Sequence, residues 1–169
     1  MAPKIRSAAI ITKIGSSEAE AAASRVAKLL DANKVKVYSV LPLKIAGTTT
    51  VDQQKLKGAM IDIVFAIGGD GTTLRAFRTI PGKAPLFSIN SGGHRGILSE
   101  TDTDAIDEAV GMILAGKYFY DSRTRIQAFS GKTAFPPALN DILVTRVSLT
   151  RTPLVSIRLM GDEIKQRMD

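Results

Sequence analysis

The sequence predicts an α/β domain with a parallel sheet and helices on both faces, followed by the start of an all-β domain. Short apolar, β-branched runs such as residues 8–11 and 61–67 alternate with amphipathic helical segments as far as Gly116. Such alternation is typical of βαβ units, whose right-handed crossovers build a parallel sheet. After Gly116 the helical pattern stops and short alternating runs replace it. We therefore expect a Rossmann-like domain over residues 1–116 and an incomplete β-rich domain over residues 117–169.

The composition favours a cytoplasmic protein with a packed core. Apolar residues make up 44% of the 169 positions, yet none of their runs approaches the ~20 residues of a membrane-spanning helix. The N-terminus lacks the apolar core of a signal peptide. The absence of cysteine excludes disulfides and thiolate metal sites, and a single histidine excludes a histidine-rich metal site.

The net charge of +7 indicates an anionic partner. The basic residues are scattered along the chain, and only 5% of residues are aromatic, which leaves few side chains for stacking on bases. We therefore expect nucleotide phosphates as the ligand, and no nucleic acid and no membrane as partners.

The chain is expected to open with a strand, a helix and a second strand. The first strand covers residues 8–11 and turns at residues 15–17, where Ser17 and Glu20 are expected to form a capping box. Residues 35–41 form the second strand. The apolar face of the intervening helix contains Ala19, Ala22, Ala23, Val26, Leu29 and Leu30.

The segment from residue 42 to residue 60 has little pattern, with a loop over residues 46–50 and a short helix over residues 51–57. The next strand, residues 61–67, is apolar throughout except for Asp62, as expected for a strand buried on both faces. It leads directly into the most informative stretch of the chain.

Three glycines surround one aspartate in Gly68-Gly69-Asp70-Gly71, and Thr72 and Thr73 are expected to cap a helix that runs through Arg78. A strand, a glycine turn and a helix start together offer backbone N–H groups to a phosphate. A carboxylate only accepts hydrogen bonds and repels bare phosphate, so Asp70 suits a hydroxyl, or a metal that bridges to phosphate. The stretch thus predicts phosphoryl transfer. The alternative is a tight Asp-Gly turn without chemistry.

A second glycine-rich turn, residues 91–98, follows a strand expected over residues 84–90. It lies at the carboxyl end of that strand, where open α/β sheets bind ligands. It contains His94, the only histidine, which we expect to be solvated, and Arg95. The helix after it covers residues 102–115 and ends at Gly116; its early acidic residues are expected to favour the helix dipole and not to bind metal.

The remainder is predicted to be strands over residues 118–129 and 138–145, with a turn at residues 130–132. Residues 154–160 and 163–167 flank Gly161-Asp162 and predict a hairpin.

Gly68-Gly69-Asp70-Gly71-Thr72 resembles the GGDGT motif of the NAD kinase family and of its superfamily, which includes lipid kinases. Residues 90–98 resemble the family segment N-x-G-x-x-G-F-L, with one extra residue and with Ile97 in place of phenylalanine. Asn140-Asp141 is similar to the N-E/D motif, which favours an NAD kinase over a lipid kinase.

The resemblance implies transfer of a phosphoryl group to the 2′-hydroxyl of the adenosine ribose of NAD, with Asp70 as the catalytic residue. It implies ATP or polyphosphate as donor, a divalent metal such as Mg²⁺ bound through donor phosphates without protein metal ligands, and a homo-oligomer. The nucleotide contacts implied are Gly68, Gly69, Asp70, Gly71, Thr72, Arg75, Asn140, Asp141, Arg151, Arg167 and Asp169.

Two other functions stay open at this point: a lipid kinase of the same superfamily and a non-catalytic nucleotide-binding module. The ending 166–169 resembles the segment just before the family's phosphate loop. We therefore expect a chain truncated within its second domain, with little kinase activity of its own.

Overall fold

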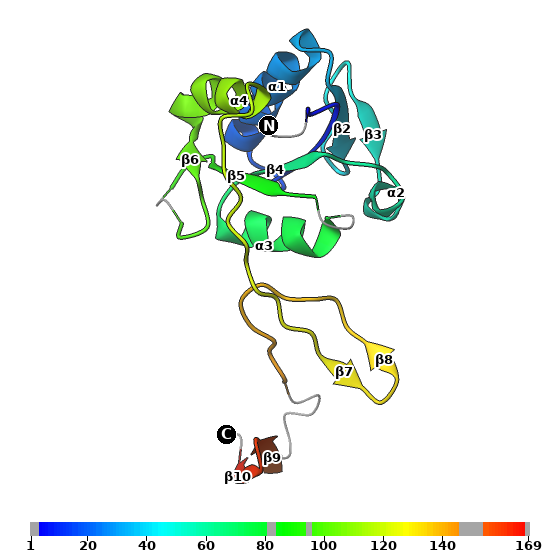
Figure 1. Cartoon of the computed structure of the whole chain (residues 1–169), viewed down its shortest axis with the longest axis vertical. Helices are drawn as coiled ribbons and strands as arrows, with labels where there is room; N and C mark the ends of the chain where they lie inside the picture. The colour runs from blue at the N-terminus through cyan, green and yellow to red at the C-terminus, as the bar shows by residue number, and fades with distance from the viewer. Residues whose placement is uncertain (1–3, 81–83, 94–95, 146–153, 168–169) are drawn as a thin grey trace.

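A computed structural model describes residues 4–80, 84–93, 96–145 and 154–167. Its main feature is a six-stranded sheet in the order β3-β2-β1-β4-β5-β6 (Figure 1). The strands of this sheet are β1 (Ser7–Thr12), β2 (Lys36–Val40), β3 (Thr49–Val51), β4 (Ile63–Ile67), β5 (Leu86–Asn90) and β6 (Thr101–Asp102). The helices are α1 (Ser17–Ala32), α2 (Gln53–Lys57), α3 (Asp70–Thr79), a short 3-10 helix η1 (Thr103–Ala105) and α4 (Ile106–Leu114).

All neighbouring strands of this sheet are parallel, and the order reverses between β1 and β4. At the centre, Ile10 lies opposite Ser39 on one side and Phe65 on the other. This is the strand order of a Rossmann-type doubly wound sheet, whose ligands bind at the carboxyl ends of the strands beside the reversal. The predicted fold class is confirmed.

Helices cover both faces, as predicted, because successive strand residues point to opposite sides. Ala8, Ile10 and Phe65 pack toward α1 and α4, while Ala9 and Val64 contribute to the core on the face of α2 and α3. In Figure 1, α1 and α4 lie together on one side of the sheet and α3 lies on the other. The central strands are therefore shielded from solvent on both faces.

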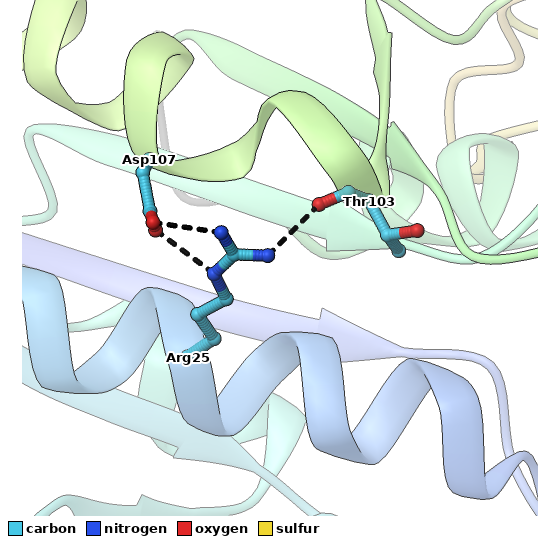
Figure 2. Close-up of polar contacts among 3 residues, drawn as sticks. All are labelled: Arg25, Thr103 and Asp107. Carbon is cyan, nitrogen blue, oxygen red and sulfur yellow. Dashed lines mark hydrogen bonds and ion pairs between the residues drawn. The ribbon is translucent and has the colours of Figure 1, made fainter.

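An ion pair joins α1 to α4 (Figure 2). The Arg25 guanidinium donates to both carboxylate oxygens of Asp107, at 2.9 and 2.7 Å, and to the carbonyl of Thr103 at 3.3 Å. Asp107 belongs to the acidic cluster at the helix start. This member of the cluster thus holds two helices together.

Two helix starts differ from the sequence-based expectation. The cap of α1 is Ser16, whose hydroxyl accepts from the Ala19 N–H at 3.2 Å, so the expected box at Ser17 is wrong by one residue. Helix α3 begins at Asp70 after the cap residue Gly69, and Thr72 therefore lies inside its first turn. The main chain sets this start, because the Thr72 N–H already donates to the Gly69 carbonyl at 2.9 Å, directly after β4.

One strand was missed. The expected loop over residues 46–50 ends in β3, which pairs with β2 at the sheet edge. Its three residues, Thr49–Val51, include two threonines and form no apolar run, so no alternation reveals them. The short helix expected after it is present as α2.

The later segments form two separate hairpins. One joins β7 (Phe129–Ser130) to β8 (Thr133–Ala134), and the other joins β9 (Leu154–Leu159) to β10 (Asp162–Arg167). Long strands over residues 118–129 and 138–145 are wrong: the described part shows an isolated bridge between Ile126 and Ala138 there. Extended segments become strands only with a partner ladder, and β7 and β9 pair only with β8 and β10 among the described residues.

The predicted hairpin turns are present. Gly131 has φ +57° between β7 and β8, and Met160 and Gly161 have φ +51° and +99° between β9 and β10. Positive φ at both central residues is the geometry of a two-residue hairpin turn. The turn thus lies at Met160-Gly161, one residue before the expected Gly161-Asp162.

Candidate functional site

The carboxyl ends of β1, β4 and β5 meet at one edge of the sheet. The Lys13 N–H, just after β1, donates to the Ile67 carbonyl at 2.8 Å, and the Gly68 N–H donates to the Ile89 carbonyl at 2.9 Å. The glycine turn after β4 therefore starts at the reversal of strand order. This position is the usual ligand site of such sheets.

Gly68 occupies a position that other residues fit poorly. Its φ is +154°, and a Cβ built on it would lie 2.4 Å from the Thr72 Oγ1 and 2.9 Å from the Lys13 Cβ. Both the backbone conformation and the lack of space select glycine. The close contact packs the start of α3 against the end of β1.

Asp70 rests on the second glycine-rich turn. Its Oδ2 accepts from the Ile97 N–H at 3.2 Å and its Oδ1 from the Leu98 N–H at 3.1 Å. A carboxylate offers about four lone-pair directions, so each oxygen can accept another donor, such as a ribose hydroxyl. The geometry is a fixed hydrogen-bond acceptor between two turns.

The Arg75 side chain links α3 to the end of β1. Its guanidinium Nη2 donates to the Thr12 carbonyl. Its Nε is buried and has no hydrogen-bond partner among the described residues. The side chain therefore supports the site from the sheet side, and its predicted contact with a nucleotide stays a prediction.

Positive charge is also present at this edge. Lys13 is exposed at the end of β1 and contacts the glycine turn through its stem. The pKa of Glu18, at the start of α1, is held below its usual value by a backbone hydrogen bond and the Ser16 hydroxyl, and to a smaller degree by the charge of Lys13. A cation placed here would favour an anionic ligand.

The predicted contacts in the later segments are not joined to this edge. Asn140 and Asp141 are exposed just after the Ile126–Ala138 bridge, and Arg167 is exposed at the end of β10. Within the described ranges, no hydrogen bond or ion pair links these three to Asp70 or its turn. The other predicted contacts, Arg151 and Asp169, lie outside the described residues, as do His94 and Arg95. So do Pro81 and Gly82, which the sequence predicts to end the helix that runs through Arg78.

The structure thus unites residues 68–72, Arg75 and residues 96–98. Sequence reasoning identified the second turn as a ligand site, and the family resemblance placed it near the first turn, but the hydrogen bonds of its N–H groups to Asp70 were not predicted. The donors there are backbone N–H groups, which carry no residue-type signal. The one hint in the sequence was the glycine at position 96, which leaves room for the Asp70 carboxylate. Lys13 was missed because a single lysine after a strand is common.

A large cavity lies beside this site but does not contain its carboxylate. It has a volume of about 1210 Å³ and lies along β5, α3 and α4, with lining side chains such as Phe77, Phe87 and Tyr118. Asp70 and the glycines of its turn are not among its lining residues. We place the site by its chemistry, because volume alone supplies neither the carboxylate nor the strand-end donors.

A metal site made by protein alone is not evident. Among the described residues, no group of three or more acidic, histidine or cysteine side chains is arranged to hold a metal ion. Nor, in the same ranges, does any helix have the length and apolar character needed to cross a membrane.

A doubly wound α/β domain, with a glycine turn and a carboxylate at the reversal of strand order, defines the class as a nucleotide-binding fold. A family model described as the ATP-NAD kinase N-terminal domain matches residues 8–118, well over half of the chain. The chain belongs to the NAD kinase family.

Curated relatives agree with this assignment, and a solved structure has a similar fold. An NAD kinase of Thermococcus sibiricus is 32% identical over 80% of this chain and 49% of its own length, and one of Aromatoleum aromaticum is 30% identical over 100% and 59%. The chain therefore spans about half the length of these curated relatives. The fold is similar to that of an Archaeoglobus fulgidus NAD kinase solved in complex with ATP, with a TM-score of 0.65, 23% identity and coverage of 96% of this chain and 58% of that one.

Proposed function

We propose that the protein transfers a phosphoryl group from ATP or polyphosphate to the 2′-hydroxyl of the adenosine ribose of NAD. The observation that carries this proposal is the Asp70 carboxylate, fixed between two glycine turns at the reversal of strand order. The family assignment and the names of the relatives support the choice of NAD and a phosphate donor.

In the reaction, Asp70 accepts the hydrogen bond of the 2′-hydroxyl and takes its proton as the new bond forms. The hydroxyl oxygen bonds to the terminal phosphorus of the donor, and the bond from that phosphorus to its bridging oxygen breaks. With ATP the leaving group is ADP. Since proton removal from an alcohol is late in such reactions, most of the acceleration comes from positioning and charge neutralisation.

The donor brings its own metal. In the described part of the chain no cluster of acidic side chains forms a cage, and Mg²⁺ commonly binds through substrate phosphates with few protein ligands. The ion would bind through the donor phosphates and would neutralise part of their charge. Lys13 and the N–H groups at the start of α3 supply further positive potential.

Residues 117–169 supply the remaining NAD contacts in this proposal. Asn140 and Asp141 would bind the nicotinamide-side ribose and base, since an amide and a carboxylate suit ribose hydroxyls. Arg151, Arg167 and Asp169 would add further nucleotide contacts. We also infer a cytoplasmic homo-oligomer, which would bring such contacts from neighbouring subunits.

The proposal is tested by incubating the complete protein, not residues 1–169 alone, with NAD, Mg²⁺ and either ATP or polyphosphate. An NADP-specific dehydrogenase then measures the product, and parallel reactions offer diacylglycerol as acceptor. We expect NADP from NAD and no phosphorylated lipid. Phosphorylation of the lipid alone would assign the site to a lipid kinase, and nucleotide binding without any transfer would leave a binding module.

A further inference from the structure

Gly96 lies against the reacting group of the proposed site. A Cβ built on Gly96 would lie 1.9 Å from Oδ1 and 2.4 Å from Cγ of Asp70, far inside contact distance. The next two residues, Ile97 and Leu98, provide the N–H groups on which the carboxylate rests. Any side chain at Gly96 would therefore lift the carboxylate off both donors.

The turn itself is anchored to the sheet. Ser88, in β5 and only 2% exposed, donates its hydroxyl to the Leu98 carbonyl. The Glu100 N–H donates to the Ser88 carbonyl at 3.1 Å and to the Ser88 hydroxyl at 3.3 Å. Since β5 pairs with β4, which leads into Asp70, the donors and the carboxylate belong to one rigid frame.

We propose that Gly96 is a positioning residue for the reaction: together with the Ile97 and Leu98 N–H groups it fixes the Asp70 carboxylate in the orientation that receives the 2′-hydroxyl. This inference rests on the proposed function. An unheld aspartate at a helix start samples several rotamers, and a displacement of about 1 Å can lower a rate on the order of 100-fold. The second turn thus acts on the acceptor substrate, NAD, only indirectly, because it orients the Asp70 carboxylate.

The contact can be measured without substrate. Amide signals of Ile97 and Leu98 in ¹H–¹⁵N spectra are compared among wild type, Gly96→Ala, Asp70→Asn and a matched control, Gly111→Ala. Gly111 lies in α4 with no atom within 4 Å of a built Cβ. We expect both signals to move in Gly96→Ala and in Asp70→Asn, and to stay in the control. Unmoved signals in Asp70→Asn would overturn the contact even if Gly96→Ala fails to fold.

The kinetic test measures NADP formation by the complete protein carrying each substitution alone and both together. Gly96→Ala is expected to lower kcat about 100-fold with the dissociation constant for NAD within a few-fold of wild type. Combined with Asp70→Asn, it should lower kcat no further than Asp70→Asn alone, because both act through one group. Multiplying effects would overturn the proposal. If the complete wild-type protein makes no NADP while the variants show the expected amide shifts, the proposed function is rejected and the contact of Asp70 with the Ile97 and Leu98 N–H groups is confirmed.

Discussion

The glycines of the first turn have different structural roles. Gly68 has no room for a Cβ beside Thr72 and Lys13, whereas Gly71, in the same motif, has open space around it. The motif therefore mixes a glycine required by packing with glycines that leave the backbone open for a ligand. The distinction is invisible in the sequence, where all three look alike.

Replacing Gly68 by alanine is expected to lower the free energy of unfolding by about 1–3 kcal/mol, because it adds steric overlap to a strained backbone. Urea denaturation followed by circular dichroism measures the change. The control Gly111→Ala, in a helix with free space, should raise stability by up to about 1 kcal/mol. Equal stability of Gly68→Ala and wild type would contradict the steric crowding at this turn.

Helices α1 and α4 are joined on one face of the sheet by the Arg25–Asp107 pair, which is exposed and hydrogen-bonded through both carboxylate oxygens. The pKa of Asp107 is lowered from 3.8, chiefly because its carboxylate accepts hydrogen bonds from Arg25. The pair therefore contributes its full stability above the ordinary pKa of an aspartate and loses it as the pH falls through the lowered value.

Asp107→Asn should accordingly be somewhat less stable than wild type near neutral pH and equally stable in strong acid. Thermal unfolding of both proteins from neutral pH down to about pH 2 measures the difference, and added salt should shrink it at neutral pH. Arg25→Met combined with Asp107→Asn serves as the control, since it removes both charges. A difference that persists unchanged into acid would show that Asp107 acts through packing.

Elements were predictable where burial imposes a pattern. The β4 run, Ile63–Ile67, and the stripe of α4 were evident because each faces a core. Strand β3 and the cap of α1 were not, because a short edge strand has no buried pattern and three neighbouring residues, Gly15 to Ser17, could all turn the chain. Of the site, the glycine turn was evident, but its contact with Ile97 and Leu98 is a tertiary backbone contact that no local pattern encodes.

At the scale of the whole molecule, the core ends before the proposed domain boundary. Within the described ranges, the buried hydrophobic residues begin at Ile5 and end at Ile113, and Gly116 follows with φ +72° at the end of α4. Later apolar side chains, such as Phe119, Leu143 and Leu159, are 90%, 80% and 68% exposed. The stability of the chain therefore resides in residues 1–116.

A fragment of residues 1–116 is expected to fold by itself and to unfold within a few degrees of the whole chain. Differential scanning calorimetry of the two proteins tests this, with circular dichroism to confirm helix content. If the fragment is unfolded, the later hairpins contribute to the core and the proposed boundary at Gly116 is wrong.

The sheet brings two turns together, and we propose that the carboxylate held between them acts on a ribose hydroxyl. The most direct measurement is made on the complete protein: the kcat of NADP formation by Asp70→Asn and its dissociation constant for NAD. Asp31→Asn, an exposed change in α1, is the matched control. Asp70→Asn keeps the size of the side chain but removes the proton acceptor. We predict a fall in kcat on the order of 10²–10⁴-fold with NAD affinity changed only a few-fold, and an unchanged control. Activity of Asp70→Asn within a few-fold of wild type would contradict the claim.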